Sequence, residues 1–196
     1  NKEMMYDMMR LSTLPNTIML EGNHERHIAN FAFNTNLDHS KRFMKEVVAP
    51  IVKDMTKKDV ESLQRELRLF YKSLRQCYPF SFHGKKYLVS HAGLSYVPNM
   101  TFIATSTFIN GFGAYETDIA KIYDTNYDRG MCQDFIQIHG HRGVPDGNYS
   151  YCLEGEVEFG GELKYIDITK DSFTKNGIKN DVYYKDYMRH EFQNMT

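Results

Sequence analysis

The sequence predicts an α/β protein. Apolar runs rich in β-branched and aromatic residues, typical of strands, recur along the chain, and segments with helical periodicity separate several of them. Glycine, proline and asparagine mark the joins between these segments. The 196 residues, 41% of them hydrophobic, suffice for one well-formed core, so a second full domain is not expected.

The N-terminal residues predict a helix, because apolar side chains fall on one face at helical spacing. These side chains are expected to fill the core: Met4, Met5, Met8, Met9 and Leu11. Pro15 and Asn16 end this helix, and residues 17–22 (TIMLEG) are expected to form a short buried strand. A second helix is expected to start near His24.

A longer helix is predicted to start at Thr56, because Thr56-x-x-Asp59 has the form of a capping box. Apolar residues then follow at steps of three and four: Val60, Leu63, Leu67, Phe70 or Tyr71, and Leu74. Residues 78–94 predict a hairpin with its turn at His83-Gly84. The second strand of this hairpin ends in His91-Ala92-Gly93.

The second half predicts further strands. Residues 116–123 have a helical pattern, and FIQIHGHRG predicts a strand that ends in a polar turn. Several strands follow, separated by glycines, and residues 181–194 are expected to form a terminal helix. The predicted organisation is a domain over residues 1–180 followed by a tail over 181–196.

Composition excludes some classes of protein. The net charge is −1, so no basic field indicates a large nucleic-acid footprint. No apolar stretch approaches the roughly 20 residues that cross a bilayer, and no secretory leader opens the chain. The three cysteines form no C-x-x-C pair, which argues against a disulfide framework and favours a cytoplasmic location.

One pattern occurs three times: an apolar strand-like run is followed by a turn that carries glycine and histidine. The three segments are MLEGNHE, YLVSHAGL and FIQIHGHR. In layered α/β folds, ligands bind beyond the carboxyl ends of the strands, where the loops meet. Asparagine and histidine at such ends suit manganese, iron or zinc.

These segments resemble the later metal motifs of the calcineurin-like metallophosphoesterases, closest to the branch of Ser/Thr phosphoprotein phosphatases and their bacterial and phage relatives. The matching residues are GNHE at 22–25, VSHAGL at 89–94 and HGHR at 139–142. The resemblance implies a four-layer fold in which two mixed sheets pack together between helices. It also implies hydrolysis of phosphomonoesters by a hydroxide that bridges two divalent ions, most often manganese.

The resemblance implies roles for single residues. Asn23, His91 and His141 would bind the second metal, with His139 as the alternative late ligand. His24 would act as general acid near the leaving oxygen.

Arg142 and Arg26 are further candidates for the catalytic site, as donors to the phosphoryl group, although an ordinary salt bridge is an equal alternative for either arginine. Asn110 is a candidate substrate contact in residues 102–113, a predicted loop or short helix at the mouth of the site.

The family's first two motifs, Asp-x-His and Gly-Asp-x-x-Asp-Arg-Gly, are not in this sequence, and the Asp-Arg-Gly at 128–130 falls in the wrong order. The resemblance therefore implies that the N-terminal part of the domain is missing. Three alternatives stay open beside a protein phosphatase. They are a nucleic-acid end phosphatase, a diadenosine-polyphosphate hydrolase, and an inactive fragment or binding-only module.

Overall fold

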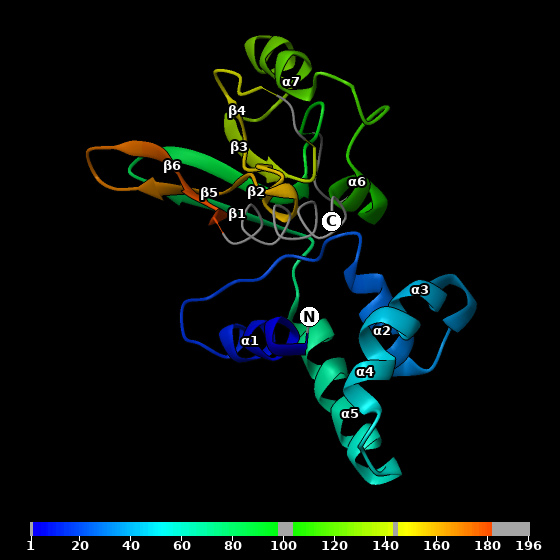
Figure 1. The fold of residues 1–196 in the computed structure, drawn as a ribbon. Coiled ribbons are helices and arrows are strands. Elements are labelled where there is room, and N and C mark those ends of the chain that lie inside the picture. Colours follow the sequence, from blue (N-terminus) through cyan, green and yellow to red (C-terminus); the bar gives the residue numbers. More distant parts are fainter. Residues whose placement is uncertain (1, 98–103, 143–144, 182–196) are drawn as a thin grey trace, which may run out of the picture. The chain divides into compact units, whose positions relative to one another are not determined.

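The computed structural model describes residues 2–97, 104–142 and 145–181 (Figure 1). It confirms the α/β class: helices accompany a mixed four-stranded sheet and a two-stranded antiparallel sheet. The chain forms two compact units, residues 1–78 and 79–196, where the sequence predicted one domain over residues 1–180.

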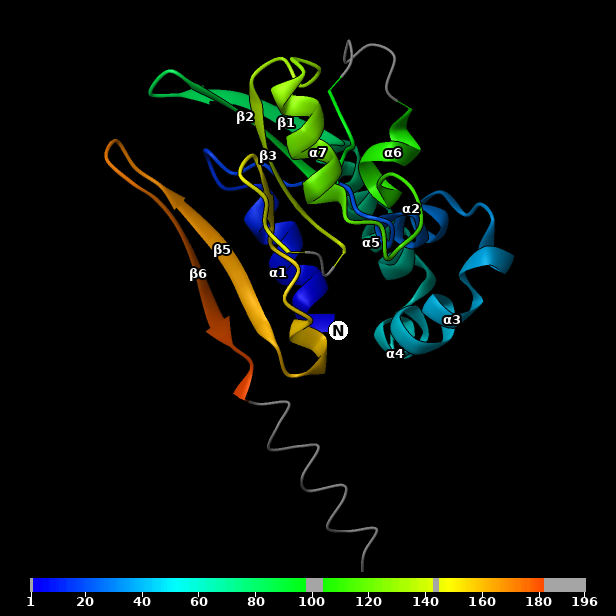
Figure 2. The same ribbon diagram turned by 90° about the horizontal axis from the view of Figure 1, so that it is seen from above.

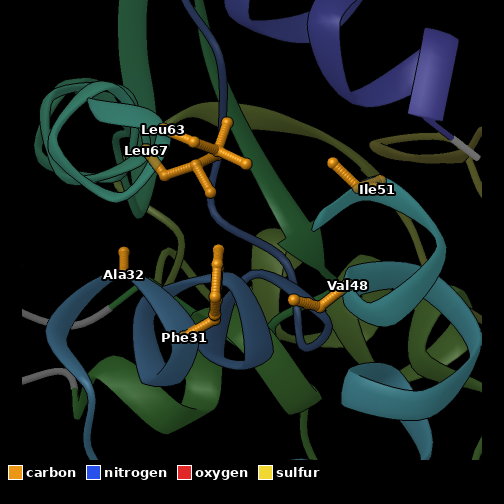
Figure 3. Close-up of a cluster of buried hydrophobic side chains, with 6 residues drawn as sticks. All are labelled: Phe31, Ala32, Val48, Ile51, Leu63 and Leu67. Carbon is orange, nitrogen blue, oxygen red and sulfur yellow. The ribbon is translucent and has the colours of Figure 1, made fainter. Parts of the chain in front are cut away.

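The first unit is helical. Its elements are α1 (Lys2–Ser12), α2 (Glu25–Phe33), η1 (Leu37–Ser40), α3 (Lys41–Phe43), η2 (Met44–Val48), α4 (Ala49–Val52) and α5 (Lys57–Ser73). Helix α2 packs against α5, and their apolar faces enclose a small core (Figure 3). The buried members of this core are Phe31, Ala32, Val48, Ile51, Leu63 and Leu67.

Helix α5 begins as the sequence predicts. The Thr56 hydroxyl accepts a hydrogen bond from the Asp59 backbone N–H at 3.3 Å, and the Asp59 carboxylate accepts one from the Thr56 N–H at 3.0 Å. This reciprocal pair satisfies donors that the first turn of a helix leaves open. Leu63, Leu67 and Phe70 are buried, while Leu74 lies just beyond the helix as its C-cap.

Helix α1 forms as predicted, but the prediction of a core role is wrong for Met4 and Met8. These side chains are 67% and 39% exposed, whereas Met5 and Met9 pack against the core. An isolated surface helix buries only the stripe that faces its neighbour, which here is α5. This stripe contains Met5 and Met9, which are one helical turn apart, and the neighbouring pair Met4 and Met8 faces solvent.

The predicted strand over residues 17–22 is wrong. The segment makes a single parallel bridge, Leu20 to Arg75, and no further ladder within the described residues. Two hydrogen bonds hold it: Glu21 N–H donates to the Arg75 carbonyl at 2.8 Å, and Arg75 N–H donates to the Met19 carbonyl at 2.9 Å. A β-rich sequence needs a partner of matching length before it becomes a strand.

The remaining elements form the sheets. They are β1 (Cys77–Phe82), β2 (Lys85–Ala92), α6 (Thr105–Asn110), α7 (Ile119–Asp128), β3 (Phe135–Gly140), β4 (Ser150–Cys152), η4 (Val157–Phe159), β5 (Glu162–Ile168) and β6 (Phe173–Lys179). The strand order is β1-β2-β3-β4, with β2, β3 and β4 parallel. The predicted hairpin turn is confirmed, because His83 and Gly84 join β1 to β2 and both have positive φ, as in a type I′ hairpin turn.

Aromatic rings join the two sheets of the second unit. Phe173 of β6 stacks on Tyr87 of β2, with ring centroids 6.0 Å apart, and contacts Tyr151 of β4 at 4.6 Å. Figure 2 shows the β5–β6 hairpin in orange as a separate pair of strands. The hairpin therefore contacts the four-stranded sheet through Phe173.

Helix α7 packs against β4. It starts at Ile119, three residues later than predicted, because the Asp118 side chain caps it by accepting from the Lys121 N–H at 3.0 Å. Tyr123 is fully buried and donates to the Phe135 carbonyl at 2.7 Å, and burial raises the pKa of its phenol. The predicted helix over 181–194 lies, except for Asp181, outside the described residues.

Candidate functional site

Two of the predicted metal ligands lie side by side at the ends of neighbouring parallel strands. Ala92 of β2 pairs with Gly140 of β3, so His91 and His141 stand at the same edge of the sheet. Their ring centroids are 4.8 Å apart, with 43° between the ring planes. The carboxyl edge of a parallel sheet is where α/β proteins bind ligands.

His141 has a left-handed backbone conformation, with φ of 67°. This region is uncommon for a residue that carries a β-carbon. The His141 imidazole lies beside that of His91. The rings of His141 and Tyr115 form an edge-to-face contact, with centroids 6.0 Å apart.

Gln137 is a positioning residue that the sequence analysis did not single out. It is fully buried, its side-chain oxygen accepts from the Leu94 N–H at 2.9 Å, and its amide nitrogen donates to the Leu94 carbonyl at 3.1 Å. The turn that follows His91 is thereby fixed to β3. A glutamine within the apolar run FIQIHG was the available signal, because buried amides need partners.

His139 is buried, 1% exposed, in the interior beside the pair. Its Nδ1 lies 3.1 Å from the Gly140 carbonyl, which can only accept, so Nδ1 carries the proton. Its Nε2 lies 3.4 Å from the Ser150 hydroxyl. Burial holds the pKa of His139 below its ordinary value, so the ring is neutral.

The His139 ring also leaves room only for glycine at position 93. A β-carbon at Gly93 would lie 3.0 Å from this ring and 2.8 Å from Ile119. Only glycine lets the backbone after β2 approach the ring so closely. His139 therefore supports the shape of this turn, and of the two late histidines it is His141 whose ring lies against His91.

Arg142 is buried, 4% exposed, and fills the loop that follows α6. Its Nη1 donates to the carbonyls of Phe112 (2.8 Å) and Ala114, and its Nη2 to those of Asn110 (2.7 Å) and Gly113 (3.2 Å). Four of the five guanidinium donors are thus committed to backbone. In this conformation Arg142 holds a loop, and none of the ion pairs among residues 2–97, 104–142 and 145–181 includes it.

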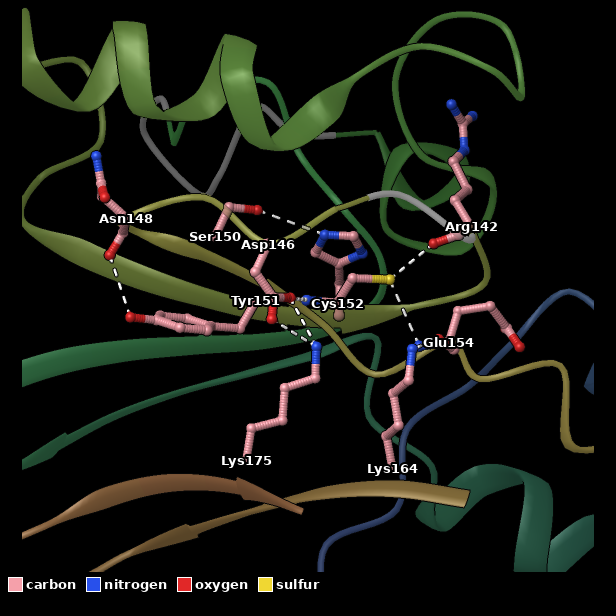
Figure 4. A network of polar contacts seen from close by, with 10 residues as sticks. Arg142, Asp146, Asn148, Ser150, Tyr151, Cys152, Glu154, Lys164 and Lys175 are labelled. Atoms are coloured by element: carbon pink, nitrogen blue, oxygen red, sulfur yellow. Dashed lines mark hydrogen bonds and ion pairs between the residues drawn. The ribbon is translucent and has the colours of Figure 1, made fainter. Parts of the chain in front are cut away.

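The Arg142 backbone is anchored as well. Its carbonyl lies 2.7 Å from the Cys152 thiol, which also contacts the Glu154 N–H at 3.4 Å. Figure 4 shows the guanidinium directed away from this thiol, toward the α6 loop. Nearby, Lys175 and Asp146 form an ion pair at 2.6 Å that joins β6 to the loop before β4. The predicted segment 102–113 contains α6, and residues 102–103 lie outside the described residues.

The GNHE motif lies in the first unit, where it opens α2. The Glu25 carboxylate accepts from the Gly22 N–H at 2.7 Å and so closes the turn. His24 is the N-cap residue of α2 and is exposed, as is Arg26, while Asn23 is half-buried. The predicted site residues therefore divide between the two units. In the second unit the structure brings His91 beside His141, and Arg142 donates to the Asn110 carbonyl.

Glu21, directly before this motif, is held by α5. The Tyr71 hydroxyl donates to its carboxylate at 2.6 Å. Burial, reinforced by the Glu21 charge, raises the pKa of Tyr71 to about 12. Tyr71 therefore stays protonated and keeps this hydrogen bond over the whole physiological pH range.

His27 anchors the first turns of α2. Its Nδ1 lies 2.8 Å from the Ser40 hydroxyl, which also accepts from the Asn30 side chain at 2.9 Å. Its ring stacks on Phe43 with centroids 5.8 Å apart. Burial, and then the positive charge of Arg26, lower the pKa of His27.

This lowered pKa predicts acid sensitivity. As the pH falls below about 6.5, the unfolded chain takes up a proton on His27 before the folded chain does, so the free energy of unfolding should decrease. Urea denaturation between pH 7.5 and 5 measures this slope. We expect His27→Gln to reduce the slope and the exposed control His39→Gln to leave it unchanged, and an equal slope in all three proteins would contradict the assignment.

Among the described residues, no cluster of three or more histidine, cysteine or acidic side chains is arranged to hold a metal ion. The His91–His141 pair is smaller than such a cluster. The helices in the described part of the chain include none that is long and apolar enough to cross a membrane.

Comparisons with known proteins leave the family open. No protein-family model matches the chain. A search of curated proteins also finds no significant similarity.

Proposed function

We propose that this chain belongs to a metal-dependent phosphoesterase with the metallophosphoesterase architecture that its motifs resemble. The observation that carries the proposal is the pairing of His91 and His141, 4.8 Å apart at the carboxyl edge of parallel strands. Two motifs almost 50 residues apart in sequence, to which the resemblance gives metal ligands, supply this pair. The α/β class with parallel central strands agrees with that architecture.

The two rings fit a shared divalent ion. An imidazole nitrogen binds such an ion at about 2.1 Å, which puts the ion about 3.2 Å from the ring centroid. Two imidazoles at adjacent positions of a tetrahedral or octahedral ion then have centroids roughly 4.5 to 5.2 Å apart. The observed separation lies within this range. Neutral nitrogen ligands suit manganese, iron or zinc.

The chemistry of the proposal follows from the residue types. Divalent ions supply a Lewis acid that binds the phosphate oxygens and lowers the pKa of water. His91 and His141 add no negative charge, so an anionic substrate is not repelled. Asn23 as a further ligand and His24 as the proton donor to the leaving oxygen stay predictions from the resemblance, as does the second ion.

We assign Arg142 a supporting role in place of the role of phosphoryl donor that the sequence suggested. Its guanidinium is committed to backbone carbonyls, so it acts on the site by holding the loop of residues 110–114. Asn110 likewise contributes its carbonyl to this contact. Arg26, exposed on α2, is the remaining candidate donor to a phosphoryl group.

A substrate panel tests the proposal. The 196-residue chain would be assayed for phosphate release with manganese or with EDTA, using a phosphoserine peptide, a 3′-phosphorylated oligonucleotide and diadenosine tetraphosphate followed by a phosphatase-coupled readout. We expect manganese-dependent release, highest with the phosphopeptide. Preference for the oligonucleotide would instead indicate a nucleic-acid end phosphatase. Manganese binding without turnover of any substrate would indicate a binding-only module, and absence of both would reject the proposal.

A further inference from the structure

Two aromatic side chains stand exposed on the loop beside the histidine pair. Phe112 is 45% exposed and Tyr115 is 58% exposed. The Tyr115 ring lies 6.0 Å from the His141 ring, measured between centroids, and the planes are at 79°. The Tyr115 ring therefore borders the histidine pair on the side of His141.

The loop that carries these rings is fixed in place. Arg142 donates to the carbonyls of residues 110 and 112–114, and its guanidinium carbon lies 6.0 Å above the Tyr115 ring. A β-carbon at Gly111, whose φ is 76°, would lie 3.0 Å from Arg142 Nε and 3.2 Å from the Ala92 β-carbon. The loop is thus pressed against the end of β2, directly after His91.

Packing accounts for only part of each ring. Tyr115 contacts the Arg142 guanidinium and the His141 ring, yet more than half of it is exposed, and Phe112 gives its carbonyl to Arg142 while its side chain is 45% exposed. Tyrosine in particular combines a large contact surface with few rotatable bonds, which is why it is frequent in recognition surfaces. Because Tyr115 lies next to the paired histidines, a ligand bound there could contact its exposed ring.

We propose that Tyr115, on the same loop as the exposed Phe112, is a specificity residue that binds the planar ring of a phosphomonoester whose phosphate lies at the His91–His141 site. Between two phosphomonoesters that are otherwise alike, the one with a planar ring close to the ester oxygen should then bind more tightly. This inference rests on the proposed function, because the phosphate must bind at the histidine pair. Phosphotyrosine and nucleoside phosphates are two sources of such a ring.

The test compares two non-hydrolysable ligands that differ only in the ring. Binding of phenylphosphonate and methylphosphonate to the manganese-loaded chain would be measured by calorimetry. Ring contacts of this kind correspond to roughly two- to tenfold in affinity. We expect phenylphosphonate to bind tighter by about this factor. Tyr115→Ala should bring the ratio close to one, and Tyr115→Phe should restore it.

Phe159→Ala is the matched control, because Phe159 is 69% exposed on η4 of the same unit. It should leave the ratio unchanged. Equal binding of the two phosphonates, or a ratio that survives Tyr115→Ala, would overturn this inference and leave the proposed function standing. Failure of both phosphonates to bind would overturn both. Turnover of a phosphotyrosine peptide against a 3′-phosphorylated dinucleotide then identifies the source of the ring.

Discussion

Replacing Arg142 with methionine is expected to lower the free energy of unfolding by about 3 kcal/mol, since it leaves several backbone carbonyls without their donor. Four carbonyls of residues 110–114 accept from this one side chain. Methionine fills a similar volume but donates nothing. Water can reach part of this loop, which keeps the loss below the sum of four buried groups.

Two measurements check this expectation. Urea denaturation followed by circular dichroism gives the loss of stability, and amide hydrogen exchange shows whether residues 104–115 lose protection first. Arg142→Lys should be intermediate, because an ammonium cannot reach four carbonyls that are spread around a planar guanidinium. Arg129→Met, at an exposed position after α7, is the control. Equal stability of the two methionine variants would contradict the role of Arg142.

Replacing His91 or His141 with alanine is expected to weaken manganese binding on the order of 100-fold, since loss of residues that merely orient a ligand already costs about 10- to 100-fold. Both side chains are partly exposed, so the fold should survive either change. Manganese titration followed by electron paramagnetic resonance measures the affinity. His83→Asn is the control, because it removes a histidine from the hairpin turn and asparagine tolerates the positive φ there.

The double variant adds a sharper test. If the two rings bind one ion, the loss of one leaves the other with little to contribute, so the double variant should lose less than the product of the single losses. Independent, multiplicative effects would mean that the two histidines do not share an ion. Single variants that bind manganese as the unaltered chain does would reject the metal site altogether.

Local sequence patterns predicted much of the fold because some elements are stabilised by residues that are close together in sequence. The capping box at Thr56 and the His83-Gly84 turn satisfy hydrogen bonds and dihedral angles among close neighbours. The candidate pair was predictable for a related reason. His91 is the next-to-last residue of β2 and His141 directly follows β3, and parallel strands bring such positions to one edge.

Other features depend on partners far away in sequence. Residues 17–22 have the composition of a strand, but Arg75 offers them one bridge only. Arg142 belongs to a motif that suggested a phosphate donor, yet the loop near Asn110, some 30 residues earlier, takes its guanidinium. Gln137 acts through Leu94, which the sequence does not place beside it. The sequence pattern of a segment does not predict which distant residue will contact it.

The left-handed backbone of His141 bears on how the site would change over evolutionary time. A residue with a β-carbon costs roughly 1 kcal/mol in this conformation relative to glycine. In a lineage that no longer used the imidazole, glycine or asparagine would be the more stable choice there, and drift would favour it. The residue found at this one position in any relative thus records whether selection still maintains the site.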